Sequence, residues 1–196
     1  MSSDSKHSIS KLFIHNLCVS YDKKIVLDSI NHTVLAGDIL YLNQKNGSGK
    51  TTLLNTISGD RTADSGEIMV DGKMILDLPI QKRPVAYLRQ DLPHFSNLTV
   101  RQTFELSKTK WTDVVPILKD FALEKAENIL MSELSGGQRQ LVLLIQMVHL
   151  NREVLLLDEP YAKLDAANKA KAHEYVKNVV RTHNRYCLLA HHGDLS

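Results

Sequence analysis

Short apolar runs and alternating runs divide the chain into predicted strands. Apolar and polar residues alternate over 12–19 and 25–34, which predicts two strands joined by a turn at 21–24. The run 154–157 is apolar throughout, as is typical of a central strand in a parallel sheet. Further strands are predicted at residues 38–42, 85–88 and 186–190, and a hairpin that turns at Asp71-Gly72 is predicted at 65–73.

Apolar residues spaced three or four apart predict the helices. The segment 136–148 is apolar almost all round, so this helix should be buried. Two helices fall between 99 and 121, and Pro116 is expected in the first turn of the second. Strands and helices alternate after residue 38, which predicts an α/β protein with a mainly parallel sheet after an antiparallel hairpin. The other helices are predicted at residues 51–58 and 165–181.

The composition fits one sizeable globular domain. The 196 residues are 43% hydrophobic and 23% charged, with a net charge of +2. We expect a polar N-terminal tail at 1–10 and a single domain at 11–196. Lys and Arg form no basic block, so we expect no nucleic-acid partner. Cys18 and Cys187 lie far apart, which is typical of thiols in a reducing compartment.

The hydropathy of the chain predicts no membrane segment. No apolar run has the length that a bilayer requires, and residues 1–7 lack the apolar core of a signal peptide. We therefore expect a cytosolic protein, for which any link to a membrane must come through a partner.

A loop of small residues joins the strand at 38–42 to the helix at 51–58. From Gln44 it reads QKNGSGKT, which matches the end of the phosphate-loop pattern G-x-x-x-x-G-K-[ST] but lacks the first glycine. Backbone N–H groups of such a loop, together with the positive end of the helix, form an anion site. In this pattern Lys50 reaches the outer phosphates and the Thr51 hydroxyl can bind Mg²⁺. The alternative is a Gly-rich turn before a helix.

Two carboxylates, Asp158 and Glu159, follow the apolar strand at 154–157. Ligands of open α/β sheets sit at the carboxyl ends of the strands, where the phosphate loop should also lie. Asp158 can hold Mg²⁺, and Glu159 can take a proton from an attacking water. The alternative is a pair of solvated acids before Pro160.

The segment LSGGQRQ, residues 134–140, opens the predicted helix at 136–148. Ser135 is a suitable N-cap, and the two glycines would allow a phosphate close to the helix N-terminus. One chain has no evident need for a second phosphate-binding helix end. Either a second chain supplies the nucleotide, or this is an ordinary Ser-Gly helix start.

LSGGQRQ resembles the signature sequence of the ATP-binding cassette (ABC) family, and the resemblance covers residues 11 to 192 in the family's order. It implies a P-loop NTPase core with a mainly parallel sheet, an N-terminal antiparallel β subdomain, and a short helical insert. The insert spans about residues 98–150 and carries the signature motif. Tyr21 resembles the aromatic residue that stacks on adenine, and Gln90 resembles the Q-loop glutamine.

The resemblance implies ATP and Mg²⁺ as cofactors and an ATPase reaction. Glu159, Gln90 and a histidine would be catalytic, and Thr51, Gln90 and Asp158 would organise the metal. Ser135 and Gly137 would reach the nucleotide of an opposing subunit. The full set of implied cofactor-binding residues is Tyr21, Asn46, Gly47, Ser48, Gly49, Lys50, Thr51, Thr52, Ser135, Gly136, Gly137, Gln138 and Asp165.

The catalytic histidine is either His191 or His192. Aligning 186–190 with the family's last strand favours His192, whereas a shift of one residue would select His191. Side chains alternate along an extended segment, so we expect only one of the two to face the site.

The resemblance also implies partners. These are a second ABC ATPase domain, in a homodimer or a heterodimer, and an integral membrane transporter subunit that ATP hydrolysis drives. The chain would then be cytoplasmic and peripheral at the inner face of the membrane. One alternative is a soluble ABC ATPase that acts as an assembly factor.

Gln44 motivates another alternative, a nucleotide-binding module that does not hydrolyse ATP. Glycine adopts positive φ freely, while other residues lose about 1–2 kcal/mol there. If the loop needs that geometry, Gln44 strains it. We expect ordinary extended backbone at this position, which would make the substitution harmless.

Overall fold

The computed structural model describes residues 10–45, 47–91 and 96–192. Four strands form an antiparallel sheet in the order β2-β1-β4-β5. The first two, β1 and β2, make the predicted hairpin, and each is longer than the alternation alone indicated. Their bounds are β1 Lys11–Tyr21, β2 Lys24–Leu35, β4 Ser65–Val70 and β5 Lys73–Met74.

The second sheet is parallel throughout and has the order β3-β8-β7-β6. Every residue of β7 is buried, as expected of a central strand that is covered on both faces. The carboxyl ends of these strands therefore meet at one edge of the sheet. Their bounds are β3 Ile39–Leu42, β6 Val85–Leu88, β7 Val154–Asp158 and β8 Tyr186–Ala190.

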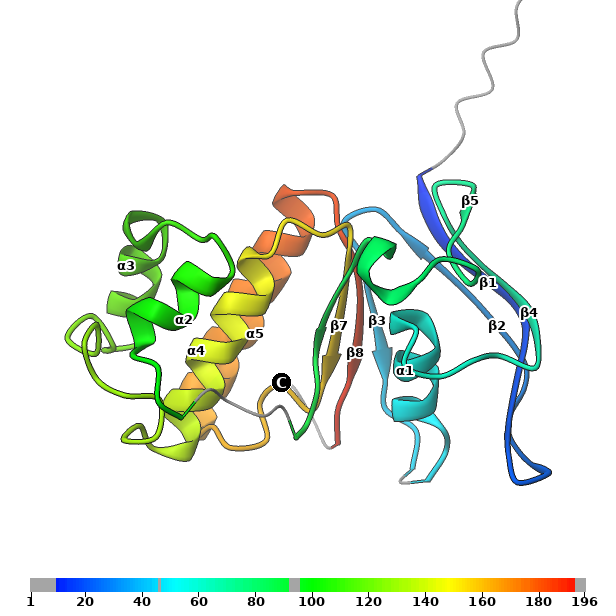
Figure 1. The fold of residues 1–196 in the computed structure, drawn as a ribbon, viewed down its shortest axis with the longest axis horizontal. Helices are drawn as coiled ribbons and strands as arrows, with labels where there is room; N and C mark the ends of the chain where they lie inside the picture. The colour runs from blue at the N-terminus through cyan, green and yellow to red at the C-terminus, as the bar shows by residue number, and fades with distance from the viewer. Residues whose placement is uncertain (1–9, 46, 92–95, 193–196) are drawn as a thin grey trace, which may run out of the picture.

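Helices cover both faces of the parallel sheet (Figure 1). The first, α1, lies between the two sheets, and α4 and α5 lie on the opposite face of the parallel sheet. The two short helices α2 and α3 lie beyond α4, farthest from the antiparallel sheet. A single turn of 3₁₀ helix, Ile80–Lys82, precedes β6. The helix bounds are α1 Lys50–Ser58, α2 Val100–Leu106, α3 Trp111–Asp120, α4 Gly136–His149 and α5 Ala166–Thr182.

Two apolar cores follow from these layers. One fills the space between the sheets and surrounds α1 through Leu54 and Ile57, which are fully buried. The other joins the opposite face of the parallel sheet to α4 and the short helices, with Phe104 at its centre. The two cores fix α1 and α4 on opposite sides of β7. This is the predicted α/β architecture with an N-terminal antiparallel sheet.

The position of Pro116 was predicted wrongly. The helix α3 begins at Trp111, so Pro116 lies inside it and not in its first turn. Its missing N–H leaves the Thr112 carbonyl without the usual helical donor. Val114 and Leu118 are fully buried on either side of it, so tertiary packing outweighs the local cost of the proline.

Arg83, a buried residue that no sequence pattern singled out, holds the carboxyl end of α1. Its Nη1 donates to the carbonyls of Thr56 at 2.7 Å and Ile57 at 2.9 Å. Its other donors reach the carbonyls of Leu76 and Leu78. A cation at this end is favoured by the helix dipole and satisfies carbonyls that the helix leaves unpaired. Arg83 thus fixes the helix whose opposite end opens the phosphate loop.

Candidate functional site

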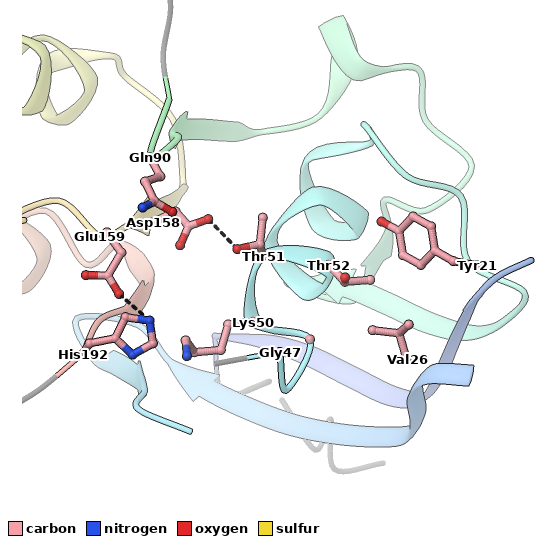
Figure 2. A pocket seen from close by; sticks show the side chains of 11 residues that line it. Tyr21, Val26, Gly47, Lys50, Thr51, Thr52, Gln90, Asp158, Glu159 and His192 are labelled. Carbon is pink, nitrogen blue, oxygen red and sulfur yellow. Dashed lines mark hydrogen bonds and ion pairs between the residues drawn. The ribbon is translucent and has the colours of Figure 1, made fainter. Parts of the chain in front are cut away.

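A cavity of about 560 Å³ opens at the carboxyl edge of the parallel sheet. Tyr21 and Val26 lie at one end, and the acidic residues Asp158 and Glu159 lie at the other, with Lys50 between them (Figure 2). A molecule with a planar group near Tyr21 and negative charge near Lys50 would match this layout. The lining residues are Tyr21, Val26, Gly47, Gly49, Lys50, Thr51, Thr52, Gln90, Asp158, Glu159 and His192.

The phosphate loop meets α1 at Gly49, where only glycine fits. Its φ is 93°, and a Cβ there would lie 2.6 Å from Cδ2 of Leu27. Gly49 is the N-cap residue, and no described side chain caps the helix there. Its first N–H groups are therefore left for a ligand, and they carry the positive end of the helix dipole.

Lys50 curves back over the loop and is only 9% exposed. Its Nζ donates to the carbonyls of Gln44 at 2.6 Å and Lys45 at 3.4 Å. Neither partner carries a charge, and no ion pair of Lys50 occurs among the described residues. The ammonium group is thus a partly desolvated cation that is well suited to bind an anion.

Gln44 has ordinary backbone geometry, as expected. It is not among the described non-glycine residues with positive φ, and its side chain is exposed. The carbonyl that holds Lys50 belongs to the backbone, so any residue could supply it. The strain that would have favoured a hydrolysis-deficient module is therefore absent at this position.

Thr51 and Asp158 meet across the cavity, where the Thr51 hydroxyl donates to Oδ2 of Asp158 at 2.9 Å. Asp158 is 3% exposed, and its burial raises the pKa of the carboxyl group, while the Thr51 hydrogen bond and the Lys50 charge act in the opposite direction. A nearby cation would stabilise the ionised form of this buried carboxylate. The hydroxyl and carboxylate oxygens are also the hard donors that Mg²⁺ prefers, so these residues fit that metal.

Glu159 turns sharply out of β7 into the cavity. Its φ is 50°, a conformation that is unusual for Glu and is often found at functional sites. Its Oε1 is buried and lies 3.2 Å from Nε2 of His192, without the geometry of a hydrogen bond. The contact therefore depends on charge, and it becomes favourable when the imidazole is protonated.

The two adjacent histidines lie in different surroundings. His192 lines the cavity, and 46% of its side chain is exposed. His191 is buried and packs edge-on against the Tyr41 ring, with 6.1 Å between the ring centroids. His191 does not line this cavity.

The signature residues line a second cavity, of about 410 Å³. Ser135 caps α4 by accepting from the Gln138 N–H at 3.2 Å, while the Gln138 side chain accepts from the Ser135 N–H at 3.0 Å. A Cβ on Gly137 would lie 2.8 Å from the Lys163 carbonyl, so the two segments can approach only at glycine. The capping role of Ser135 that the sequence indicated is thus present.

Asp165 lines the second cavity as well and caps α5. Its Oδ1 accepts from the Asn168 N–H at 2.8 Å, and this hydrogen bond lowers the pKa of the Asp165 carboxyl. The capping bond leaves this carboxylate ionised at the rim of the cavity.

Not all predicted site residues come together in one chain. The two cavities share no lining residue, although each holds part of the predicted set. Gly136 is the first residue of α4, and Ser48 lies in the loop without lining the first cavity. Asn46 lies outside the described residues.

The family model described as ABC transporter matches residues 27–162. The chain belongs to the ABC transporter family. Curated relatives include the spermidine/putrescine import ATP-binding protein PotA of Mycoplasma capricolum, 34% identical over 176 residues, which are 86% of this chain and 50% of that protein. The sulfate/thiosulfate import ATP-binding protein CysA of Synechocystis is 33% identical over 177 residues, 86% of this chain and 50% of that protein.

This ABC-family chain thus spans about half the length of the curated relatives that it matches. Its fold also matches solved structures. One is the ADP conformation of an ATP-binding cassette of an ABC transporter, with a TM-score of 0.79. That match covers 95% of this chain and 83% of the other at 23% identity, so it supports the fold alone.

Proposed function

We propose that this chain binds ATP with Mg²⁺ and hydrolyses it. The observation that carries the proposal is that one cavity brings together a buried cation, a hydroxyl–carboxylate pair and a second carboxylate. An aromatic ring lies at the other end of the same cavity (Figure 2). Membership of the ABC family supports it further.

Each end of the cavity suits one part of the nucleotide. Tyr21 stacks on the base, with Val26 beside it. Lys50 and the first N–H groups of α1 hold the phosphates. The Thr51 hydroxyl, Asp158 and the Gln90 amide would hold Mg²⁺. When bound, this ion would neutralise charge on the phosphates.

The reaction is the transfer of a phosphoryl group to water. Glu159 takes the proton of the attacking water, because its carboxylate projects into the cavity next to Asp158. His192 lies 3.2 Å from Glu159 and donates toward the terminal phosphate. Catalysis then rests on positioning and on charge that the folded site already holds.

Removing the metal tests this proposal directly. We expect ATP turnover by the purified protein to stop in EDTA and to return with excess Mg²⁺. The reason is that Asp158 and Thr51 would hold this ion, and without it the Asp158 carboxylate would face the phosphates with no cation to offset the repulsion. Phosphate release with and without chelator is the measurement, and turnover that persists in EDTA would contradict the assignment of these residues.

We further propose that the second cavity completes the site of another ABC ATPase domain. Ser135, Gly137 and Asp165 lie away from the first cavity, so in one chain they cannot act on its nucleotide. A second domain, identical or different, would place each signature helix against the phosphates held by the other. This arrangement would place a phosphate at the N-terminus of α4, where the helix dipole favours an anion beside the Ser135 cap.

We propose a membrane transporter subunit as the other partner, with the chain peripheral to the cytoplasmic face of the membrane. The support is the similarity to PotA and CysA, which are import ATP-binding proteins. None of the helices in the described part of the chain has the length and hydropathy to cross a bilayer.

Affinity capture from detergent-solubilised native membranes tests the membrane partner. We expect a protein with several membrane spans to be recovered with the tagged chain, in an amount that matches it. Recovery of soluble proteins alone would favour the alternative that the chain is a soluble ABC ATPase that acts as an assembly factor.

A further inference from the structure

Arg61 covers part of the Tyr21 ring. The central carbon of its guanidinium group lies 3.9 Å from the ring centroid, which is within the range of a cation–π contact. Tyr21 is the last residue of β1 and pairs with Lys24 across a turn in which Asp22 and Lys23 have positive φ. The ring therefore lies at the tip of the β1–β2 hairpin.

Arg61 is itself held at two points, one on its backbone and one on its guanidinium group. The backbone N–H of Arg61 donates to the Asn55 carbonyl at 3.0 Å, and Gly59 donates to the same carbonyl at the end of α1. Its Nη2 donates to the Ser20 carbonyl, next to Tyr21. Arg61 thus ties the carboxyl end of α1 to the strand end that carries the ring.

Arg61 contacts the ring but does not line the cavity. Tyr21 is 39% exposed and lines the cavity, whereas Arg61 is half-buried and does not line it. The Nε atom of Arg61 is buried and makes no hydrogen bond within the described part of the chain. The ring contact is therefore the main compensation for burying this part of the cation.

We propose that Arg61 positions Tyr21 for stacking on the nucleotide base. This inference rests on the proposed function and names the residue that sets the base end of that site. Tyr21 lies at the opposite end of the cavity from Glu159 (Figure 2), so Arg61 should affect binding and leave the chemical step unchanged. Without Arg61 the ring must be ordered when the base binds, and that ordering weakens binding.

The test compares steady-state kinetics of the wild type with Arg61→Ala and Arg61→Lys. We expect Arg61→Ala to raise KM for ATP about two- to tenfold with kcat unchanged, because base stacking contributes equally to ground state and transition state. Arg61→Lys keeps a cation near the ring and should recover part of the loss. The control is Arg101→Ala, which removes a guanidinium that pairs with Glu105 and Glu127 on the helical insert.

A double-mutant cycle shows whether Arg61 acts through Tyr21. In a Tyr21→Ala background, Arg61→Ala should raise KM no further, since the ring that it positions is gone. Inorganic triphosphate, which has no base, should inhibit the wild type and Arg61→Ala equally. An unchanged KM in Arg61→Ala, or a further rise in the Tyr21→Ala background, would overturn the inference.

The same experiment distinguishes failure of the proposed function from failure of the inference on Arg61. If Arg61→Ala unfolds, the cycle is measured with Arg61→Lys: a KM equal to that of the wild type, or a KM of the double variant above that of Tyr21→Ala alone, would overturn the inference. A wild type that neither binds nor hydrolyses ATP, with Mg²⁺ present, would overturn the proposed function and this inference with it. An active wild type with an unaffected Arg61→Ala would overturn the inference alone.

Discussion

Replacing Glu159 with Gln is expected to lower ATP turnover by about 10²–10⁴-fold while ATP binding remains. The amide has nearly the same shape as the carboxylate, but it cannot accept a proton from water. Glu159 makes no hydrogen bond through Oε1 in the described structure, so the substitution breaks no structural bond at that atom. The loss should therefore appear in kcat, with little change in affinity or in melting temperature.

Single-turnover and steady-state phosphate release measure the effect, and gel filtration with ATP and Mg²⁺ measures association. We expect Glu159→Gln to retain ATP and to elute as a dimer, since hydrolysis can no longer separate the domains. Glu153→Gln is the matched control, because Glu153 is an exposed acid just before β7 and lies outside the cavity. Equal turnover in Glu159→Gln and the wild type would refute the role of Glu159. Negligible turnover in both, with dimers and any membrane partner present, would refute the active enzyme.

The parts of the site that lie in short continuous segments could be predicted from the sequence. The phosphate loop could be predicted because its sequence pattern is local: it lies between a strand and a helix, and its Gly49 occupies a conformation that only glycine fits. Asp158 follows a fully apolar strand, and that strand could be placed at the centre of a parallel sheet. Local periodicity and spacing therefore gave the fold class and the edge at which the site forms.

The parts that depend on contacts between distant segments could not be predicted. Arg83 reaches the end of α1, and Arg61 reaches Tyr21, across sequence separations that carry no periodic signal. The backbone of Glu159 has a positive φ, whereas the conformational preference of Glu predicts a negative φ. Pro116 was misplaced for a related reason, since burial of its neighbours overrides the local preference. In each case tertiary structure decides what local sequence leaves open.

Replacing Lys50 is expected to weaken ATP binding more than any other single change at the phosphate end. Hydrogen bonds from a charged donor contribute roughly 1.5–3 kcal/mol each, so losing one or two phosphate contacts should lower the affinity about 10- to 10⁴-fold. Lys50→Met removes the ammonium group and keeps most of the apolar stem. Isothermal titration with ATP and Mg²⁺ measures the change, and Lys73→Met on the exposed strand β5 serves as the control.

The same substitution separates the function of Lys50 from its effect on stability. Among the described residues, the carbonyls of Gln44 and Lys45 are the hydrogen-bond partners of the buried ammonium, and burying a cation with such uncharged partners is costly. We therefore expect ligand-free Lys50→Met to melt at the same temperature as the wild type or a higher one, while it loses the stabilisation that ATP gives. A variant that melts lower and still binds ATP normally would show that Lys50 serves the loop structure and not the phosphates.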